Sequence, residues 1–271
     1  MIAIILTEFR KLTTIKVWWV MLLIAFSYVA LADGALVWAA HAADSLNMGA
    51  GQAMPMPTGG DLARMVYATG PAFGYVFPAL LGAMMMSSEY RHRTITPTFL
   101  AEPHRGRVLL GKLIAMVPFG LANGVVVVAA SVSVGGGMLY LFGLPTGLGD
   151  WSTQEFFLRT LASMTIWGLV GVGLGALLKH QVAAIVALLG FTQFLEPVLR
   201  MLPMFTGNNY PWLNYLPGAV GDAINGSSLY SFMTTTPAAP LSLEWALLVL
   251  IGYAALFSLV GYFTTIRRDV S

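Results

Sequence analysis

The chain has 271 residues, of which 57% are apolar and only 10% are charged, and its formal net charge is +2. A water-soluble domain carries about 25% charged residues because its surface must be solvated. This composition therefore argues against an ordinary soluble enzyme and predicts an integral membrane protein. The absence of cysteine excludes disulfides and thiolate metal sites. The four histidines, His41, His92, His104 and His180, lack the spacing of a local zinc site, so no metal is expected.

Residues 1–16 predict an amphipathic helix that lies on the membrane surface. One helical face collects the apolar side chains, which are Ile2, Ile5, Leu6, Phe9 and Leu12. Glu8 and Lys11 lie elsewhere on the helix, as expected for an interfacial helix. The alternative is a simple extension of the first membrane span. A signal peptide is excluded because the charges follow the first apolar cluster and no small-residue cleavage site comes after it.

Six segments are long enough to cross the membrane, because a spanning helix needs about 20 mostly apolar residues. They are Val17–Ala40, Met65–Ser87, Leu113–Phe142, Phe156–Leu178, Val182–Leu202 and Leu243–Ile266. The third segment is long enough to tilt or to break at residues 135–137, where three glycines follow one another. We expect an all-α membrane protein that forms a single transmembrane domain over residues 1–271.

Prolines and glycines predict details of the spans. Pro71, Pro78 and Pro118 predict local kinks. Two pairs of glycines have the GxxxG spacing, and they are Gly120 with Gly124 and Gly171 with Gly175. Small residues let helices approach closely in a membrane, so these pairs predict close helix packing.

The distribution of lysine and arginine predicts the orientation, because cytoplasmic loops collect basic residues. With the N-terminus inside, eleven of the fourteen lysines and arginines lie on the cytoplasmic side. They are Arg10, Lys11, Lys16, Arg91, Arg93, Arg105, Arg107, Lys112, Lys179, Arg267 and Arg268. Arg64, Arg159 and Arg200 remain outside. Both termini are therefore expected in the cytoplasm. Residues 203–242 form an outer loop, which predicts short re-entrant or interfacial helices.

Residues 88–112 form a long basic insertion between the second and third spans, where a few residues would make a turn. Pro97 and Pro103 are expected to break helices there. The length and the prolines favour a cytoplasmic elbow that docks a partner. The alternative is a basic loop that sets the topology and contacts anionic lipid. Residues 106–112 have the spacing GxxxxGK, but no strand precedes them and Leu113 replaces the Ser or Thr of a phosphate-binding loop, so we reject that motif.

Charged residues inside spans are costly and are candidates for function. Asp33 lies in the outer half of the first span. Glu196 and Arg200 are four residues apart in the fifth span, so we expect them to share a helical face and to form an ion pair. Gln193 is expected on the same face. This group is either structural or part of a translocation pathway.

Three classes of function compete. An intramembrane hydrolase needs a paired acid and base or a nucleophile motif inside the spans, and none is found. A secondary transporter predicts internal repeats and midplane charges, which are also not apparent. A transport subunit driven by a separate ATPase needs an element for docking at the inner face and fits best.

The chain is similar to the permease subunit of ABC exporters of the ABC-2 (type V exporter) family. The similarity rests on the N-terminal segment ILTEFRKLTTIKVWW, on Glu89–Ile95, on Phe99–Arg105 and on Gly111 with Lys112 before the third span. Family members commonly read E-(F/Y)-R-x-G-T in the second of these segments. Arg93 stands where the glycine is usual, and this departure is expected to stiffen the turn.

The resemblance implies a translocation pathway formed by two permease copies, identical or paralogous, each docked to a separate ABC ATPase. ATP and magnesium would bind that ATPase, whereas this chain would carry no cofactor, catalyse no reaction and bind no nucleic acid. The implied coupling residues are Glu8, Arg10, Lys11, Glu89, Tyr90, Arg91, His92, Arg93, Thr94, Phe99, Leu100 and Arg105. A multi-pass protein of the plasma membrane in contact with lipid is expected, and the composition is typical of bacteria. The alternative is a secondary transporter or a structural membrane subunit without an ATPase.

Overall fold

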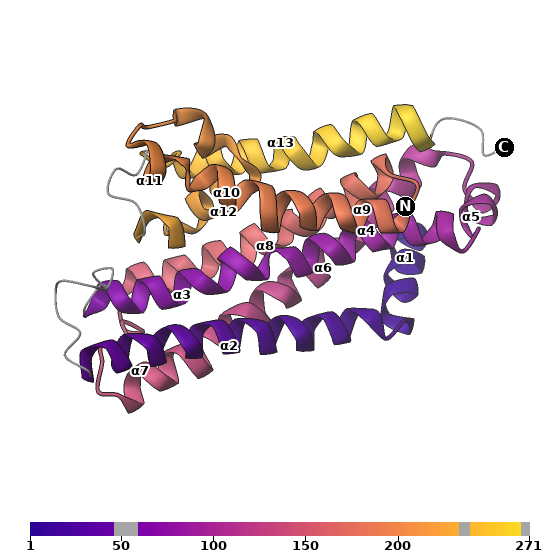
Figure 1. Cartoon of the computed structure of the whole chain (residues 1–271). Coiled ribbons are helices and arrows are strands. Elements are labelled where there is room, and N and C mark those ends of the chain that lie inside the picture. Colours follow the sequence, from indigo (N-terminus) through magenta and orange to yellow (C-terminus); the bar gives the residue numbers. More distant parts are fainter. Residues whose placement is uncertain (46–58, 233–238, 267–271) are drawn as a thin grey trace.

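The computed structural model describes residues 1–45, 59–232 and 239–266, which form helices and turns without a strand. Figure 1 shows long helices that run side by side, with short helices at both ends of the bundle. The α-helices are α1 (Ile2–Thr14), α2 (Val17–Ser45), α3 (Gly60–Gly74), α4 (Val76–Arg91), α5 (Ile95–Ala101), α6 (Arg105–Ala130), α7 (Gly137–Leu141), α8 (Trp151–Leu177), α9 (Gln181–Leu189), α10 (Glu196–Arg200), α11 (Leu202–Thr206), α12 (Pro217–Asn225) and α13 (Leu243–Gly261). The π-helices are η1 (Ser131–Gly136), η2 (Gly190–Leu195) and η5 (Tyr262–Ile266), and the 3₁₀ helices are η3 (Pro211–Tyr215) and η4 (Leu229–Phe232).

Six helical stretches of the described residues are long and apolar enough to cross a membrane, which confirms the predicted number of spans. They are Val17–Ala43, Gly60–Arg91, Arg105–Leu141, Trp151–Leu177, Gln181–Thr206 and Leu243–Ile266. The third stretch begins eight residues earlier than predicted, because the basic residues before Leu113 are already helical.

The two ends of the bundle differ in their content. Figure 1 shows α1, α5 and the end of α13 at one end, which we call the α1 end, and α7, α11 and α12 towards the other, which we call the α12 end. The α1 end holds nine of the described basic residues, which are Arg10, Lys11, Lys16, Arg91, Arg93, Arg105, Arg107, Lys112 and Lys179. The α12 end holds Arg64, Arg159 and Arg200. Arg267 and Arg268 lie outside the described residues.

Helix α8 lies at the centre and packs closely on α4 and α6. A Cβ added to Gly171 or Gly175 would overlap the backbone carbonyl of Ala79 or Ala83 in α4. Gly120 and Gly124 of α6 meet the backbone of α8 in the same way. Both GxxxG pairs therefore lie at helix contacts, which confirms that prediction.

Interruptions of the helices differ partly from the predictions. The second span is interrupted at Tyr75, where Pro78 has no N–H to donate to the carbonyl of Gly74. The third span does not break at residues 135–137. It continues through the π-helix η1 into α7, so of the two predicted alternatives, a tilt or a break, the break is not formed. Pro97 does not break a helix either, because it lies in the first turn of α5, where an N–H is not needed for the helix.

Candidate functional site

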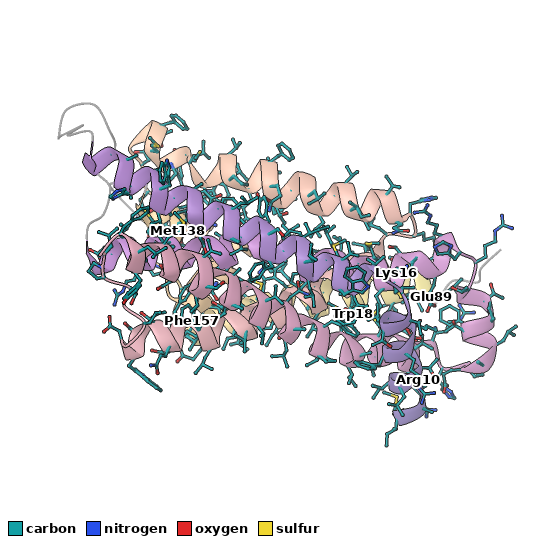
Figure 2. All side chains as sticks on the ribbon, turned by 90° about the horizontal axis from the view of Figure 1, so that it is seen from below. Arg10, Lys16, Trp18, Glu89, Met138 and Phe157 are labelled. Carbon is teal, nitrogen blue, oxygen red and sulfur yellow. The ribbon has the colours of Figure 1, made fainter. Side chains whose placement is uncertain are left out.

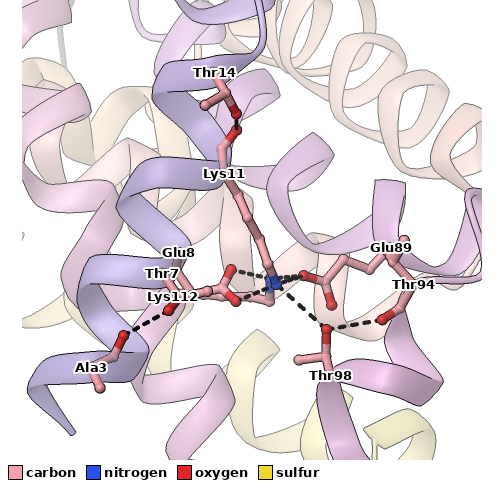
Figure 3. Close-up of polar contacts among 9 residues, drawn as sticks. All are labelled: Ala3, Thr7, Glu8, Lys11, Thr14, Glu89, Thr94, Thr98 and Lys112. Carbon is pink, nitrogen blue, oxygen red and sulfur yellow. Dashed lines mark hydrogen bonds and ion pairs between the residues drawn. The ribbon is translucent and has the colours of Figure 1, made fainter. Parts of the chain in front are cut away.

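Two acids and two lysines meet at the α1 end in a group that we call the ion cluster, formed by Glu8, Lys11, Glu89 and Lys112 (Figure 3). Lys112 Nζ lies 2.5 Å from Glu8 Oε2 and 2.6 Å from Glu89 Oε1. Lys11 Nζ lies 2.7 Å from Glu8 Oε1 and 2.8 Å from Glu89 Oε1. The formal charges of the four side chains cancel, so the cluster is balanced.

Burial makes this cluster costly to disrupt. The side chain of Lys112 is 0% exposed, and those of Glu8 and Glu89 are 3% and 6% exposed. Removing one partner of a buried ion pair typically costs about 3–5 kcal/mol because the remaining charge is left uncompensated. The cluster therefore holds together α1, which carries Glu8, with α4 and α6, which carry Glu89 and Lys112.

Lys11 extends the cluster to the short helix α5. Its Nζ donates a hydrogen bond of 3.4 Å to Oγ1 of Thr98. Partial burial alone would lower the pKa of Lys11, but its hydrogen bonds to Glu8 and Glu89 outweigh burial and raise the pKa above its usual value. Lys11 is therefore charged at neutral pH and links α1 to both α4 and α5.

Helix α1 lies across the α1 end of the bundle (Figure 1), and its acidic side chain, Glu8, is buried. Leu12 is buried in the core with Glu8, and Ile4 contacts α6 at Gly111, where an added Cβ would lie 2.7 Å from Ile4 Cγ2. Ile2 is 75% exposed. Part of the apolar face thus points away from the bundle, and the location of α1 on a membrane surface stays a prediction.

The predicted coupling residues differ in how far their side chains are exposed. Glu8 and Glu89 are buried in the ion cluster, so they are not part of the exposed surface of the elbow. Tyr90 is half-buried and packs against the core. The exposed members are Arg10, Lys11, Arg91, His92, Arg93, Thr94 and Leu100. Figure 2 shows Arg10, Lys16 and Glu89 at the same end of the molecule.

Three of the predicted coupling residues, Arg91, Phe99 and Arg105, contact neighbouring elements and stabilise the elbow between α4 and α6. Arg105 Nη1 donates a hydrogen bond of 2.8 Å to the carbonyl of Ile266, and its guanidinium lies 5.1 Å from the ring centroid of Phe99. Phe99 is half-buried and packs on the core. Arg91 Nη1 donates a hydrogen bond of 3.2 Å to Gln181 Oε1. These contacts hold the elbow between α4 and α6 against α9 and η5.

Arg93 has φ 57°, in the left-handed region that favours glycine, and among the described residues it is the only non-glycine residue there. It follows α4 by two residues, at the turn towards α5. A side chain in this conformation costs roughly 1–2 kcal/mol. The structure thus explains why a glycine is favoured here and why Arg93 strains the turn.

The GxxxxGK stretch is helical, which agrees with the prediction that it is not a phosphate-binding loop. Helix α6 begins at Arg105 and includes residues 106–112, so no phosphate-binding loop is formed. The ammonium group of Lys112 is fully engaged by Glu8 and Glu89. These residues do not fit a nucleotide.

A second polar group lies at the α12 end, and it differs from the predicted pair. Arg200 Nη2 lies 2.5 Å from Asp222 Oδ2 of α12 and 3.0 Å from Oγ of Ser228. Its guanidinium also lies 4.0 Å from the ring centroid of Tyr230. Arg200 makes no ion pair with Glu196, so the predicted pairing is wrong. The fold of residues 203–232 brings Asp222 close enough to bind Arg200 in place of Glu196, its neighbour along the helix.

Glu196 is buried and accepts a hydrogen bond of 2.9 Å from the backbone N–H of Ala219, at the start of α12. Its other oxygen has no hydrogen-bond partner among the described residues. Gln193 is half-buried. The prediction of a common face assumed a regular α-helix, whereas η2 is a π-helix with more residues per turn.

Two adjoining pockets open at the α12 end. The larger has a volume of about 560 Å³, and Arg200, Asp222, Tyr230 and Leu241 are among its lining residues. The smaller, of about 330 Å³, is lined by polar residues that include Arg64 and Arg159. Both volumes lie within the range of small-molecule sites. The pockets share Arg159, Gly226, Ser227 and Ser231.

Asp33, the remaining predicted residue, forms no hydrogen bond or ion pair with the described residues of either polar group. It is buried in α2 beside η1, and no other described residue donates a hydrogen bond to its carboxyl oxygens. The structure therefore separates Asp33 from Glu196 and Arg200, with which it was grouped as a candidate for the pathway.

Sequence reasoning missed two central residues. Lys112 was counted among the cytoplasmic basic residues and belongs to the family pattern, but it was not predicted to be a coupling residue. Asp222 is the only acid in the predicted outer loop, residues 203–242, which lacks lysine and arginine. An isolated acid in a segment without basic residues indicates that its partner comes from another element, and this feature of the sequence could have identified Asp222.

A protein-family model matches this chain, whereas a search of curated proteins finds no relative. The match covers residues 62–271, from α3 to the last described helix and beyond. The family is described as "Protein of unknown function (DUF2705)". Because the match extends over more than half of the chain, the chain belongs to the DUF2705 family.

Proposed function

We propose that this chain is the permease subunit of an ATP-driven ABC exporter, which forms a translocation pathway as a dimer and is coupled to a separate ATPase subunit. The observation that carries the proposal is the ion cluster. It joins the elbow between α4 and α6 to the helix α1 at a strongly basic end of a six-span bundle. The resemblance of the N-terminal and elbow segments to ABC-2 permeases adds to this support.

In this proposal the α1 end faces the cytoplasm of a bacterial cell. Nine of the twelve described basic residues lie there, which is the asymmetry expected of the inner side of a plasma membrane. Helix α1 then lies at the membrane surface, and its exposed side chains Ile2 and Leu6 contact lipid.

The elbow offers a surface that fits a docking protein. Leu100, on α5, is 79% exposed. The same elbow carries exposed basic side chains, namely Arg91, His92, Arg93, His104 and Arg107. An exposed apolar side chain on a basic segment has the composition of a protein contact. The ATPase is expected to bind here and to carry the site for ATP and magnesium, because the GxxxxGK stretch of this chain forms part of helix α6.

In this proposal the ion cluster transmits movements of the docking surface to the membrane-spanning helices. A displacement of α5 acts on Lys11 through Thr98, and on α4 and α6 through the chain itself. Because Lys112 is fully buried between Glu8 and Glu89, α1, α4 and α6 are expected to move as a unit. ATP binding shifts the pathway only if the ATPase contacts the two conformations differently.

The pockets at the α12 end would then form an outer vestibule. Helix α12 packs between α3, α8 and α13, and the larger pocket combines apolar side chains with Arg200 and Asp222. This lining suits an amphipathic cargo.

The test is purification of the native assembly in mild detergent, followed by measurement of ATP hydrolysis. We expect the wild-type chain to co-purify with a separate ATPase chain. The variant Arg93→Glu with Leu100→Ser should lose at least nine-tenths of the bound ATPase, because it changes the charge and the apolar contact of the proposed surface.

A matched variant changes the same residue types at the opposite end. Arg64 is exposed there, and Leu141 has the same 79% exposure as Leu100. Arg64→Glu with Leu141→Ser should retain the ATPase. A wild-type chain that purifies without ATP hydrolysis, or an elbow variant that keeps its ATPase, would contradict the proposal.

A secondary transporter is the second candidate, and the buried carboxyl of Asp33 favours it. Ionisable residues inside membrane spans are frequent in proton and ion relays. A native assembly without ATPase whose transport depends on an ion gradient would support this alternative.

A further inference from the structure

Asp33 is an acid without a partner in the interior of the bundle. It lies in α2 and is 0% exposed. Neither of its carboxyl oxygens has a hydrogen-bond partner among the described residues, and no described lysine, arginine or histidine forms an ion pair with it. Ser131, the first residue of η1, is the polar side chain that lies beside this carboxyl, and its hydroxyl also has no partner.

The walls around Asp33 are apolar. Val37, Val66 and Leu139 are buried in the same region between α2, α3 and α7. The titratable side chain that faces Asp33 from α3 is Tyr67, whose hydroxyl donates a hydrogen bond of 2.7 Å to the carbonyl of Thr146. This tyrosine is neutral, so it does not balance a carboxylate charge.

Close packing leaves little space beside the carboxyl. A Cβ at Gly135 of η1 would lie 2.8 Å from Val66 Cγ1 and 3.4 Å from Asp33 Oδ2. A Cβ at Gly34 would lie 3.3 Å from Met138 Sδ. Glycines on both helices thus let α2 approach η1 closely. Such π-helical turns are frequent at functional sites.

We propose that Asp33 is an internal proton-binding site, protonated while α2 is packed on η1 and deprotonated when this contact opens to water. An isolated carboxylate in an apolar environment is strongly disfavoured, whereas a protonated carboxyl is neutral and can donate to the Ser131 hydroxyl. A metal cation fits poorly, because hard cations need about six oxygen ligands and Asp33 with Ser131 offers three. The inference does not depend on whether an ATPase drives the protein.

The test uses the full chain in lipid nanodiscs, with aspartate labelled by ¹³C at the side-chain carboxyl, and records its NMR signals. At pH 7 we expect one signal of a protonated carboxyl in the wild-type chain. The signal should be absent from Asp33→Asn and present in Asp61→Asn, since Asp61 is exposed to solvent, unlike the buried Asp33. It should not change when sodium is replaced by choline.

Three results would contradict a protonated Asp33. A wild-type chain in which all the aspartates give carboxylate signals at pH 7 overturns the proposal, and so does a protonated signal that remains in Asp33→Asn. A signal that moves with sodium assigns the site to a cation instead. If Asp33→Asn does not fold, Ser131→Ala replaces it, because loss of the hydroxyl next to the carboxyl should shift the protonated signal. A signal that does not move in Ser131→Ala then rejects the assignment.

Discussion

Arg200 in α10 binds Asp222 in α12, with 2.5 Å between Nη2 and Oδ2. The two residues are 22 positions apart, and Ser228 Oγ donates a hydrogen bond of 2.6 Å to the same Asp222 oxygen. Both charged side chains are largely buried. This contact holds the short helix α12 against the end of the fifth span and forms part of the wall of the larger pocket.

A double-mutant cycle on Arg200→Gln and Asp222→Asn should reveal this pair. Each single change leaves a buried charge without its partner and is expected to lower the free energy of unfolding by about 3–5 kcal/mol. The double variant should lose clearly less than the sum, with an interaction free energy of about 1–3 kcal/mol. Denaturation in detergent measures these values. The cycle of Glu196→Gln with Arg200→Gln should give a smaller interaction free energy. A larger interaction free energy for Glu196 than for Asp222 would support the pairing predicted from the sequence.

Lys112→Met tests the ion cluster, because methionine keeps an unbranched side chain of comparable length but removes the charge. Glu8 and Glu89 then share only Lys11, and we expect a loss of about 3–5 kcal/mol in the free energy of unfolding. Lys16→Met is the control, since Lys16 is exposed and should change stability by no more than about 0.5 kcal/mol. Equal stability of the two variants would show that the cluster does not hold the α1 end together.

Gly171→Ala tests the closest contact between α4 and α8. The new methyl group would overlap the carbonyl oxygen of Ala79, so the helices must separate, at an expected cost of about 1–3 kcal/mol. Gly252→Ala is the matched change in α13, where no atom lies within 4 Å of the added Cβ. That variant should gain up to about 1 kcal/mol from helix propensity. Thermal unfolding should therefore shift in opposite directions for the two variants.

Arg93→Gly should stabilise the protein by up to about 1 kcal/mol, because glycine adopts a positive φ without steric cost. The change also removes one exposed basic charge from the elbow. Arg107→Gly is the control, since it removes a similar exposed charge from a regular helix and should lose about 1 kcal/mol or less. A melting temperature that falls in both variants would mean that the left-handed conformation of Arg93 causes no strain.

The raised pKa of Lys11 leads us to expect a loss of stability at alkaline pH. Its folded pKa is raised above the ordinary value of 10.5, so above that value the folded chain retains a proton that the unfolded chain has released. Stability from this group is therefore complete below pH 10.5 and falls as the pH rises through the folded pKa. Unfolding midpoints between pH 9 and 12 should decrease less in Lys11→Arg, because arginine stays charged throughout. Identical pH profiles would exclude this contribution.

The sequence alone determined the six helical spans and the difference in charge between the two ends. Both follow from local properties, because a long apolar segment in a membrane has to satisfy its backbone hydrogen bonds within its own helix. Lysine and arginine counts then separate the segments at one end from those at the other. The glycine pairs in α6 and α8 also predicted helix contacts correctly, since the absence of a side chain is readable without a structure.

Only the tertiary structure decided which charges meet. Lys112 binds Glu8 from 104 positions away, and Arg200 prefers Asp222 to the acid one turn before it. Such pairs depend on how each helix is rotated and on which neighbour it packs against, and these properties are not local. The π-helices η1 and η2 add to this difference, because each changes the residues that share a face. Asp33 faces Ser131 and Gly135 for the same reason.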